Sequence, residues 1–173
     1  MRGEKTRKTP RPLSEETLRA LALRYVERYA TSEGKLAAYL ARKLRERGWA
    51  GERPADVEGI VAGFAALRYV DDRAFGEARA RGLERRGYGA RRIGQDLRAA
   101  GLAEDLSGEI TGAVDARGAA MAYARRKRFG PFAREAPDRA ARQKQFAAML
   151  RAGHDARIAA EILDMRDVEP DYA

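Results

Sequence analysis

The sequence predicts an all-α protein of three tandem three-helix repeats, which we expect to stack into an elongated, curved helical body. β-Branched residues are scarce, with five Ile, six Val and five Thr among 173 residues, which argues against an all-β fold. Apolar residues instead recur every three or four positions, the spacing of one face of a helix. Self-similarity at a fixed period then divides the chain into three copies.

Three aligned columns of residues define this repeat. Leucines at positions 44, 97 and 150, one every 53 residues, are each followed by an arginine. Four positions before each leucine stands another large apolar residue, and a glycine closes each segment at Gly48, Gly101 and Gly153. Because glycine enters the left-handed conformation without steric cost, these three glycines are predicted helix stops.

The first repeat covers residues 14–68 and follows a basic segment. Residues 1–13 are rich in Lys and Arg and show no apolar period, so we expect a disordered basic arm. Ser14 marks the start of the first helix. The apolar stripes of the three helices are Leu18, Leu21, Tyr25, Val26 and Tyr29; Leu36, Leu40 and Leu44; and Val57, Ile60, Val61, Phe64 and Leu67.

The second repeat covers residues 69–114, with helices predicted at 72–86, 90–100 and 103–114. Asp71 or Asp72 supplies an acceptor for the amides of the first turn. Gly87 ends the first helix, and Tyr88 and Gly89 form the turn. The remaining apolar residues form the buried faces of the second and third helices. They are Ile93 and Leu97, then Leu106, Ile110 and Val114.

The third repeat covers residues 115–163 and contains a longer loop. Its first helix is predicted at 115–129, and Gly130, Pro131 and Pro137 mark the loop that follows. The later helices bury Phe146, Met149 and Leu150, then Ile158, Ile162 and Leu163. Residues 164–173 are acidic, and we expect a frayed tail.

Composition excludes several classes of function. The chain has no Cys and one His, which rules out a disulfide scaffold, a thiolate zinc site and a thiol nucleophile. No apolar run reaches the length of a membrane span, and the N-terminus lacks the apolar core of a secretory signal. The net charge of +9 predicts an anionic partner. We expect a cytoplasmic monomer that binds no metal or cofactor.

None of the three candidate catalytic features supports an active site. Asp71 and Asp72 are adjacent carboxylates whose side chains point to different faces, so they are interpreted as helix caps. The glycine-rich run at 87–94 lacks a preceding strand and a GK[ST] ending, so it is interpreted as a helix stop and restart. His154, in the turn before the last helix, is interpreted as a cap or surface residue. We therefore expect no catalytic residues and no enzymatic activity.

Two basic clusters are the candidate binding residues. With Ile93 and Leu97 buried, Arg91, Gln95 and Arg98 fall on the outer face of their helix. The first cluster adds the neighbouring side chains of the turn, with Tyr88 exposed between guanidinium groups that can hold phosphate or carboxylate. Its other members are Arg85, Arg86 and Arg92. The second cluster, Arg125, Arg126, Lys127 and Arg128, ends a helix, where the helix dipole alone already favours cations.

Residues 69–75 (YVDDRAF) and 85–102 (RRGYGARRIGQDLRAAGL) resemble the signature of the RecX family, bacterial regulators of the RecA recombinase. The signature residues in this chain are Asp71, Asp72, Phe75, Gly87, Gly89, Ile93, Leu97 and Gly101. The chain departs from the family pattern in three places. Arg79 stands where an aromatic residue is common, Leu83 stands where a basic residue is common, and residues 152–154 (AGH) replace the usual Arg-Gly-aromatic.

The resemblance implies a regulatory function. Such proteins bind RecA, chiefly as its filament on single-stranded DNA, and inhibit its ATPase, strand-exchange and co-protease activities. They thereby regulate homologous recombination, DNA repair and the SOS response, and they are not enzymes. Two alternatives remain open. The chain could be a basic helical protein that binds single- or double-stranded DNA directly through phosphate contacts, or a scaffolding repeat protein whose charge only keeps it soluble.

Overall fold

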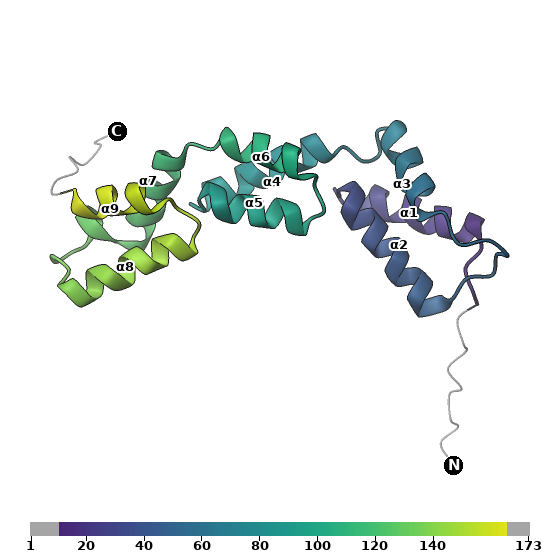
Figure 1. Ribbon diagram of the computed structural model, residues 1–173, viewed down its shortest axis with the longest axis horizontal. Coiled ribbons are helices and arrows are strands. Elements are labelled where there is room, and N and C mark those ends of the chain that lie inside the picture. The colour runs from purple at the N-terminus through teal and green to yellow at the C-terminus, as the bar shows by residue number, and fades with distance from the viewer. Residues whose placement is uncertain (1–10, 166–173) are drawn as a thin grey trace, which may run out of the picture. The chain divides into compact units, whose positions relative to one another are not determined.

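The computed structural model describes residues 11–165, which fold into nine α-helices and one short 3-10 helix (Figure 1). The only extended pairing in this range is a single bridge between Leu13 and Trp49, so the predicted all-α class is confirmed. The described chain divides into two compact units between Asp72 and Arg73. Residues 1–10 of the predicted basic arm and 166–173 of the acidic tail lie outside the described residues.

The first unit contains α1 (Glu15–Arg28), α2 (Glu33–Arg47) and α3 (Val57–Ala66). Ser14 caps α1 as predicted, with its hydroxyl accepting a hydrogen bond from the Thr17 amide at 3.3 Å. The buried core comes from all three helices and the segments that flank them. Its members are Leu13, Leu18, Ala22, Leu36, Leu40, Ile60, Val61 and Val70.

Three expectations for the first unit need correction. Leu13, assigned to the basic arm, is fully buried, because its backbone pairs with Gly48 and Ala50 at 2.9 Å each. Leu67, assigned to an apolar stripe, is 71% exposed, because α3 ends at Ala66 and leaves it at the C-cap. Tyr29 is half exposed for the same reason at the end of α1.

Asp72 caps a helix, but the helix is α2. Its Oδ1 accepts a hydrogen bond from the Glu33 amide at 2.7 Å, which satisfies one of the unpaired amides at the start of that helix. Its own helix, α4 (Asp72–Arg85), begins at this residue. Asp72, one of the two acceptors predicted for a first turn, therefore accepts from an amide of α2.

The second unit continues α4 with α5 (Ala90–Ala99) and α6 (Glu104–Gly112). It then adds α7 (Ala116–Lys127), the 3-10 helix η1 (Gly130–Phe132), α8 (Arg139–Arg151) and α9 (Ala156–Asp164). Two buried clusters lie within it, one formed by α4–α6 and one by α7–α9. Helices α4 to α7, for which ranges were predicted, agree with those ranges to within one or two residues at each end.

The glycine column of the repeat has the predicted conformation. Gly48, Gly101 and Gly153 have φ angles of +79°, +82° and +92°, and each follows the C-terminal end of a helix. The leucine column is less regular. Leu97 is fully buried, but in the third copy Met149 is fully buried and Leu150 only half-buried, so the inward face of α8 is displaced by one residue.

Two turns of the second unit meet backbone to backbone, and we call this contact the glycine junction (residues 87–89 and 152–154). The Gly89 amide donates to the Ala152 carbonyl at 3.0 Å, and the Arg91 amide donates to the Gly153 carbonyl at 3.3 Å. A Cβ at Gly89 would lie 2.3 Å from the Gly153 carbonyl oxygen. The two turns therefore approach this closely only because glycine has no side chain.

Arg79, one of the departures from the family pattern, forms an ion pair between α4 and α5. Its Nε and Nη2 donate to the two carboxylate oxygens of Asp96 at 2.6 and 3.0 Å. This paired hydrogen bond raises the pKa of Arg79 above its usual value. Arg79 thus makes a directed, charge-assisted contact between α4 and α5.

We expect Leu97→Ala to lower the free energy of unfolding by about 2–5 kcal/mol, because truncation of a fully buried leucine leaves a cavity. Urea denaturation followed by circular dichroism measures this change. Leu67→Ala is the control, since Leu67 is exposed, and its effect should stay within about 0.5 kcal/mol. An unchanged unfolding midpoint for the Leu97 variant would contradict the packing of α5.

We expect Gly89→Ala to destabilise the protein by about 1–3 kcal/mol, because the added methyl group has no space at the glycine junction. Gly108→Ala is the matched control. A Cβ at Gly108 meets nothing within 4 Å, and alanine within α6 should stabilise the helix by about 0.5–1 kcal/mol. Thermal unfolding of both variants tests the pair, and equal shifts would refute the close approach of the two turns.

Candidate functional site

Helix α5 presents a basic face to solvent. Ile93 and Leu97 are fully buried, whereas the side chains on the opposite side of the helix are exposed. The exposed residues are Arg91, Arg92, Gln95 and Arg98. The helical phase predicted for Arg91, Gln95 and Arg98 is therefore confirmed, and these side chains are accessible to a partner.

Tyr88 differs from its prediction as an exposed ring between guanidinium groups. It is half-buried, because its ring packs against both buried clusters of the second unit. One guanidinium does lie on it, since the Arg86 Cζ is 5.7 Å from the ring centroid. Arg86 also donates to the Gly82 carbonyl at 3.2 Å, which fixes its side chain at the end of α4.

A pocket of about 360 Å³, which we call the basic pocket, lies beside the glycine junction. Its cations come from three helices: Arg92 from α5, Arg126 and Lys127 from α7, and Arg151 from α8. Tyr88 and Tyr123 supply its aromatic wall, completed by Ala148 and Ala152. The fold therefore joins residues of both predicted clusters into one site.

The charge of the basic pocket is not neutralised by acidic side chains. Its lining contains no carboxylate, and within residues 11–165 none of its four cations forms an ion pair. Arg126 instead lies over Tyr123, with Cζ 5.6 Å from the ring centroid. Like charges held close together repel each other, and a bound anion would relieve that repulsion.

The other predicted binding residues lie outside the basic pocket. Arg85 lines a different hollow, together with Glu84 and Asp115. Arg125 lies over Phe132 at 5.3 Å. Arg128 was predicted inside a helix, but α7 ends at Lys127, and Arg128 adopts the left-handed conformation with a φ of +57°.

Sequence reasoning missed Arg151 and Tyr123. Arg151 belongs to the Leu-Arg pair that recurs every 53 residues. This recurrence identifies the repeat, but it does not indicate that Arg151 lines a binding pocket. Tyr123 lies two residues before the second basic cluster, but the apolar period of its helix does not indicate that its ring lines a pocket. Its place in the pocket depends on how α7 packs beside α5, which a local pattern does not reveal.

His154 is buried, which corrects its interpretation as a cap or surface residue. It is 4% exposed, and its Nε2 lies 3.1 Å from the Gly87 carbonyl oxygen across the glycine junction. Burial lowers the pKa of His154, and the hydrogen bond to Gly87 only partly opposes this effect. The neutral ring thus donates from Nε2, while Nδ1 is buried without a partner in the described structure.

Between residues 11 and 165, no three His, Asp or Glu side chains gather as metal ligands. No helix in this part of the chain is both long and apolar enough to cross a bilayer.

Comparison with known proteins identifies the family. Residues 71–109, which include the glycine turn and α5, match the family profile described as "RecX, second three-helix domain". The chain is 33% identical over 171 residues to a regulatory protein RecX from Myxococcus xanthus (strain DK1622), covering 93% of this chain and 91% of the relative. The chain belongs to the RecX family.

Further comparisons agree with this assignment. A regulatory protein RecX from Halorhodospira halophila (strain DSM 244 / SL1) is 32% identical over 161 residues, covering 91% of this chain and 94% of the relative. A crystal structure of a regulatory protein RecX has a TM-score of 0.69 and 20% identity, covering 87% of this chain and 72% of that one. At that identity the likeness shows the fold alone. The RecX resemblance predicted from residues 69–102 is confirmed.

We expect stability to fall as the pH drops from about 7.5 to 5. The folded state lowers the pKa of His154, so the unfolded chain binds the proton more readily and gains population in acid. The melting temperature of the native protein and of His154→Gln should be compared at both ends of this range. Glutamine can still donate to Gly87 but does not titrate. A pH-dependent decrease of equal size in both proteins would contradict the assignment.

Proposed function

We propose that this RecX-family protein binds the RecA recombinase, chiefly as its filament on single-stranded DNA, and inhibits its ATPase, strand-exchange and co-protease activities. The relatives are named regulatory proteins, and we infer a role without chemistry of its own. The observation that carries the proposal is the set of cations without carboxylate partners that extends from the outer face of α5 into the basic pocket.

The arrangement suits a partner with repeated negative charge. Arginine binds carboxylate and phosphate through paired hydrogen bonds, and a filament on DNA offers both acidic side chains and phosphates. The residues of the basic pocket come from three helices of a compact unit, so the fold fixes the backbone positions that carry its four cations. Cations on an ordered backbone lose less entropy on binding than those of an extended tail.

Direct binding to DNA without RecA remains the second candidate, because cations without acidic partners also fit phosphate. The two functions differ in what they inhibit. A protein that acts on the filament inhibits RecA at concentrations well below that of RecA. A protein that acts on DNA inhibits only when it covers the strand, and its affinity for bare DNA falls steeply with salt.

The test is ATP hydrolysis by RecA on single-stranded DNA at near-physiological salt, with this protein added in increasing amounts. Binding to the same DNA without RecA is measured in parallel. We expect inhibition at protein concentrations well below that of RecA and below those at which the protein covers the DNA in the parallel measurement. Absence of inhibition, or inhibition only at concentrations that coat the DNA, would refute the proposal and favour the second candidate.

Charge reversal locates the contact. We expect Arg151→Glu to raise the concentration needed for half-inhibition by about tenfold, or about 1.4 kcal/mol, because the variant repels the negative charge that the native residue attracts. Arg139→Glu changes the net charge equally at the opposite end of α8 and should inhibit normally. The double variant Arg91→Glu/Arg98→Glu tests the outer face of α5, and we expect it also to raise the concentration needed for half-inhibition. Equal inhibition by all three variants and the native protein would exclude this surface as the contact.

A further inference from the structure

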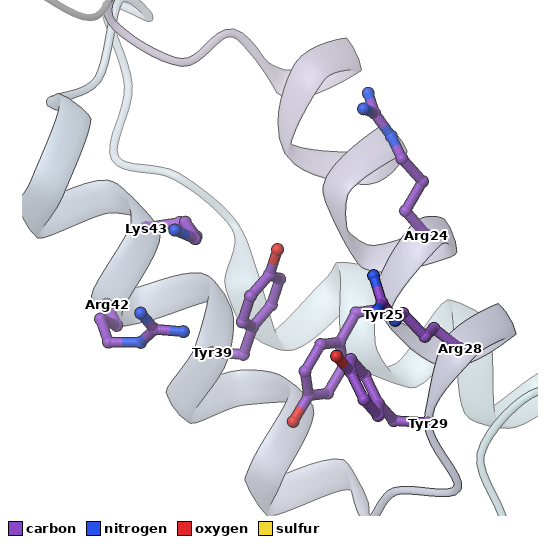
Figure 2. Close-up of a pocket in the computed structure, with 7 residues that line it drawn as sticks. All are labelled: Arg24, Tyr25, Arg28, Tyr29, Tyr39, Arg42 and Lys43. Atoms are coloured by element: carbon purple, nitrogen blue, oxygen red, sulfur yellow. The ribbon is translucent and has the colours of Figure 1, made fainter.

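A second basic pocket lies in the first unit, between α1 and α2, and none of its residues was among the predicted binding residues. It has a volume of about 470 Å³. We call it the tyrosine pocket, because three tyrosines and four cations line it, as Figure 2 shows. Its residues are Arg24, Tyr25, Arg28, Tyr29, Tyr39, Arg42 and Lys43.

The three tyrosine rings form a continuous aromatic surface. Tyr25 stacks on Tyr39, with ring centroids 4.2 Å apart and an interplanar angle of 14°. Tyr29 follows, tilted by 52° at 5.3 Å from Tyr25. Tyr29 is 49% exposed, so part of its ring is available to a further planar group. Tyr25 and Tyr39 are half-buried and pack against the core of the first unit, so they hold the exposed ring of Tyr29 in place, as the base of a stacking site requires.

Cations surround these rings. The Arg28 Cζ lies 5.6 Å from the Tyr29 centroid, and the Arg42 Cζ lies 5.5 Å from the Tyr39 centroid. Arg24 and Arg28 project from α1, and Arg42 and Lys43 from α2 (Figure 2). The pocket thus combines aromatic faces with positive charge on both of its sides.

The positive charge is compensated on one side only. Glu46 pairs with Lys43 at 2.7 Å and with Arg42 at 2.9 Å, and these contacts lower the pKa of Glu46. Arg24 and Arg28 form no ion pair with any residue from 11 to 165. Their guanidinium groups are therefore the ones open to an external anion.

We propose that the tyrosine pocket binds single-stranded nucleic acid, with a base stacked on Tyr29 and the neighbouring phosphates held by Arg24 and Arg28. Acidic polypeptide would satisfy the cations but not the exposed ring, whereas a nucleotide satisfies both. In duplex DNA the bases are already stacked on each other and their faces are not accessible. The site therefore selects unpaired strands. This inference is independent of the proposed inhibition of RecA.

The test separates stacking from charge by using two oligonucleotides with the same phosphates. Fluorescence anisotropy of the full-length protein is measured with labelled oligothymidylate of about 15 nucleotides, within the size range of such sites, and with an abasic strand of equal length. We expect tighter binding of oligothymidylate. Tyr29→Ala should weaken that binding about tenfold and leave abasic binding unchanged, while Tyr29→Phe should retain it.

Matched variants control for general effects on charge and folding. Tyr69→Ala removes another exposed tyrosine of the first unit, 54% accessible and outside the pocket, and should bind normally. Arg28→Glu should weaken binding to both strands more than Arg53→Glu, which makes the same charge change in a loop. Glu46→Gln should tighten binding, because it releases Arg42 and Lys43.

Several results would overturn the inference. Equal affinity for oligothymidylate and the abasic strand would show that no base stacks in the pocket. Normal binding by Tyr29→Ala would place the contact elsewhere, such as the basic pocket of the second unit. Competition by polyglutamate as effective as that by oligothymidylate would assign the pocket to an acidic polypeptide. None of these results alters the RecA ATPase measurement, so the two proposals fail separately.

Discussion

The close contact between two glycine turns is the constraint on which the second unit depends. At the glycine junction, backbone amides of one turn donate to backbone carbonyls of the other, and the Gly89 and Gly153 positions leave no space for a side chain. This contact places α5 beside α7 and α8, so that Arg92, Arg126 and Arg151 converge. The glycine run at 87–89 thus has a structural role, because it allows two turns to pack backbone against backbone.

Much of the fold follows from local patterns, and the exceptions share a cause. Helix periodicity identified the buried face of α5, and the glycine column identified three left-handed helix ends, because both depend on residues close in sequence. The burial of His154 depends on Gly87, far away along the chain, and so has no local signal. The displaced register of α8, where Met149 replaces Leu150 inside, likewise arises from tertiary packing.

The candidate binding residues divide along the same line. Their exposure on α5 followed from the helical phase, but their assembly into a pocket required Arg151 and Tyr123 from other helices. In the tyrosine pocket, sequence-based prediction failed for a different reason. Tyr25 and Tyr29 were recognised as part of an apolar stripe, yet periodicity alone does not tell which aromatic ring stays at the surface when a helix ends.

The positive charge of the two pockets is stabilised in different ways. In the basic pocket, helix C-termini favour Arg126, Lys127 and Arg151. In the tyrosine pocket, Glu46 neutralises the charge on one side.

The left-handed conformation of Arg128 sets two demands on one position. Glycine adopts this conformation freely, as at Gly101 and Gly153, whereas a residue with a Cβ incurs a cost of roughly 1–2 kcal/mol. A glycine at position 128 would relax the backbone at the end of α7, but it would also remove a positive charge next to Lys127. No residue at this position can both relax the backbone as glycine does and carry the positive charge. The chain has the charge, together with the less favourable backbone conformation.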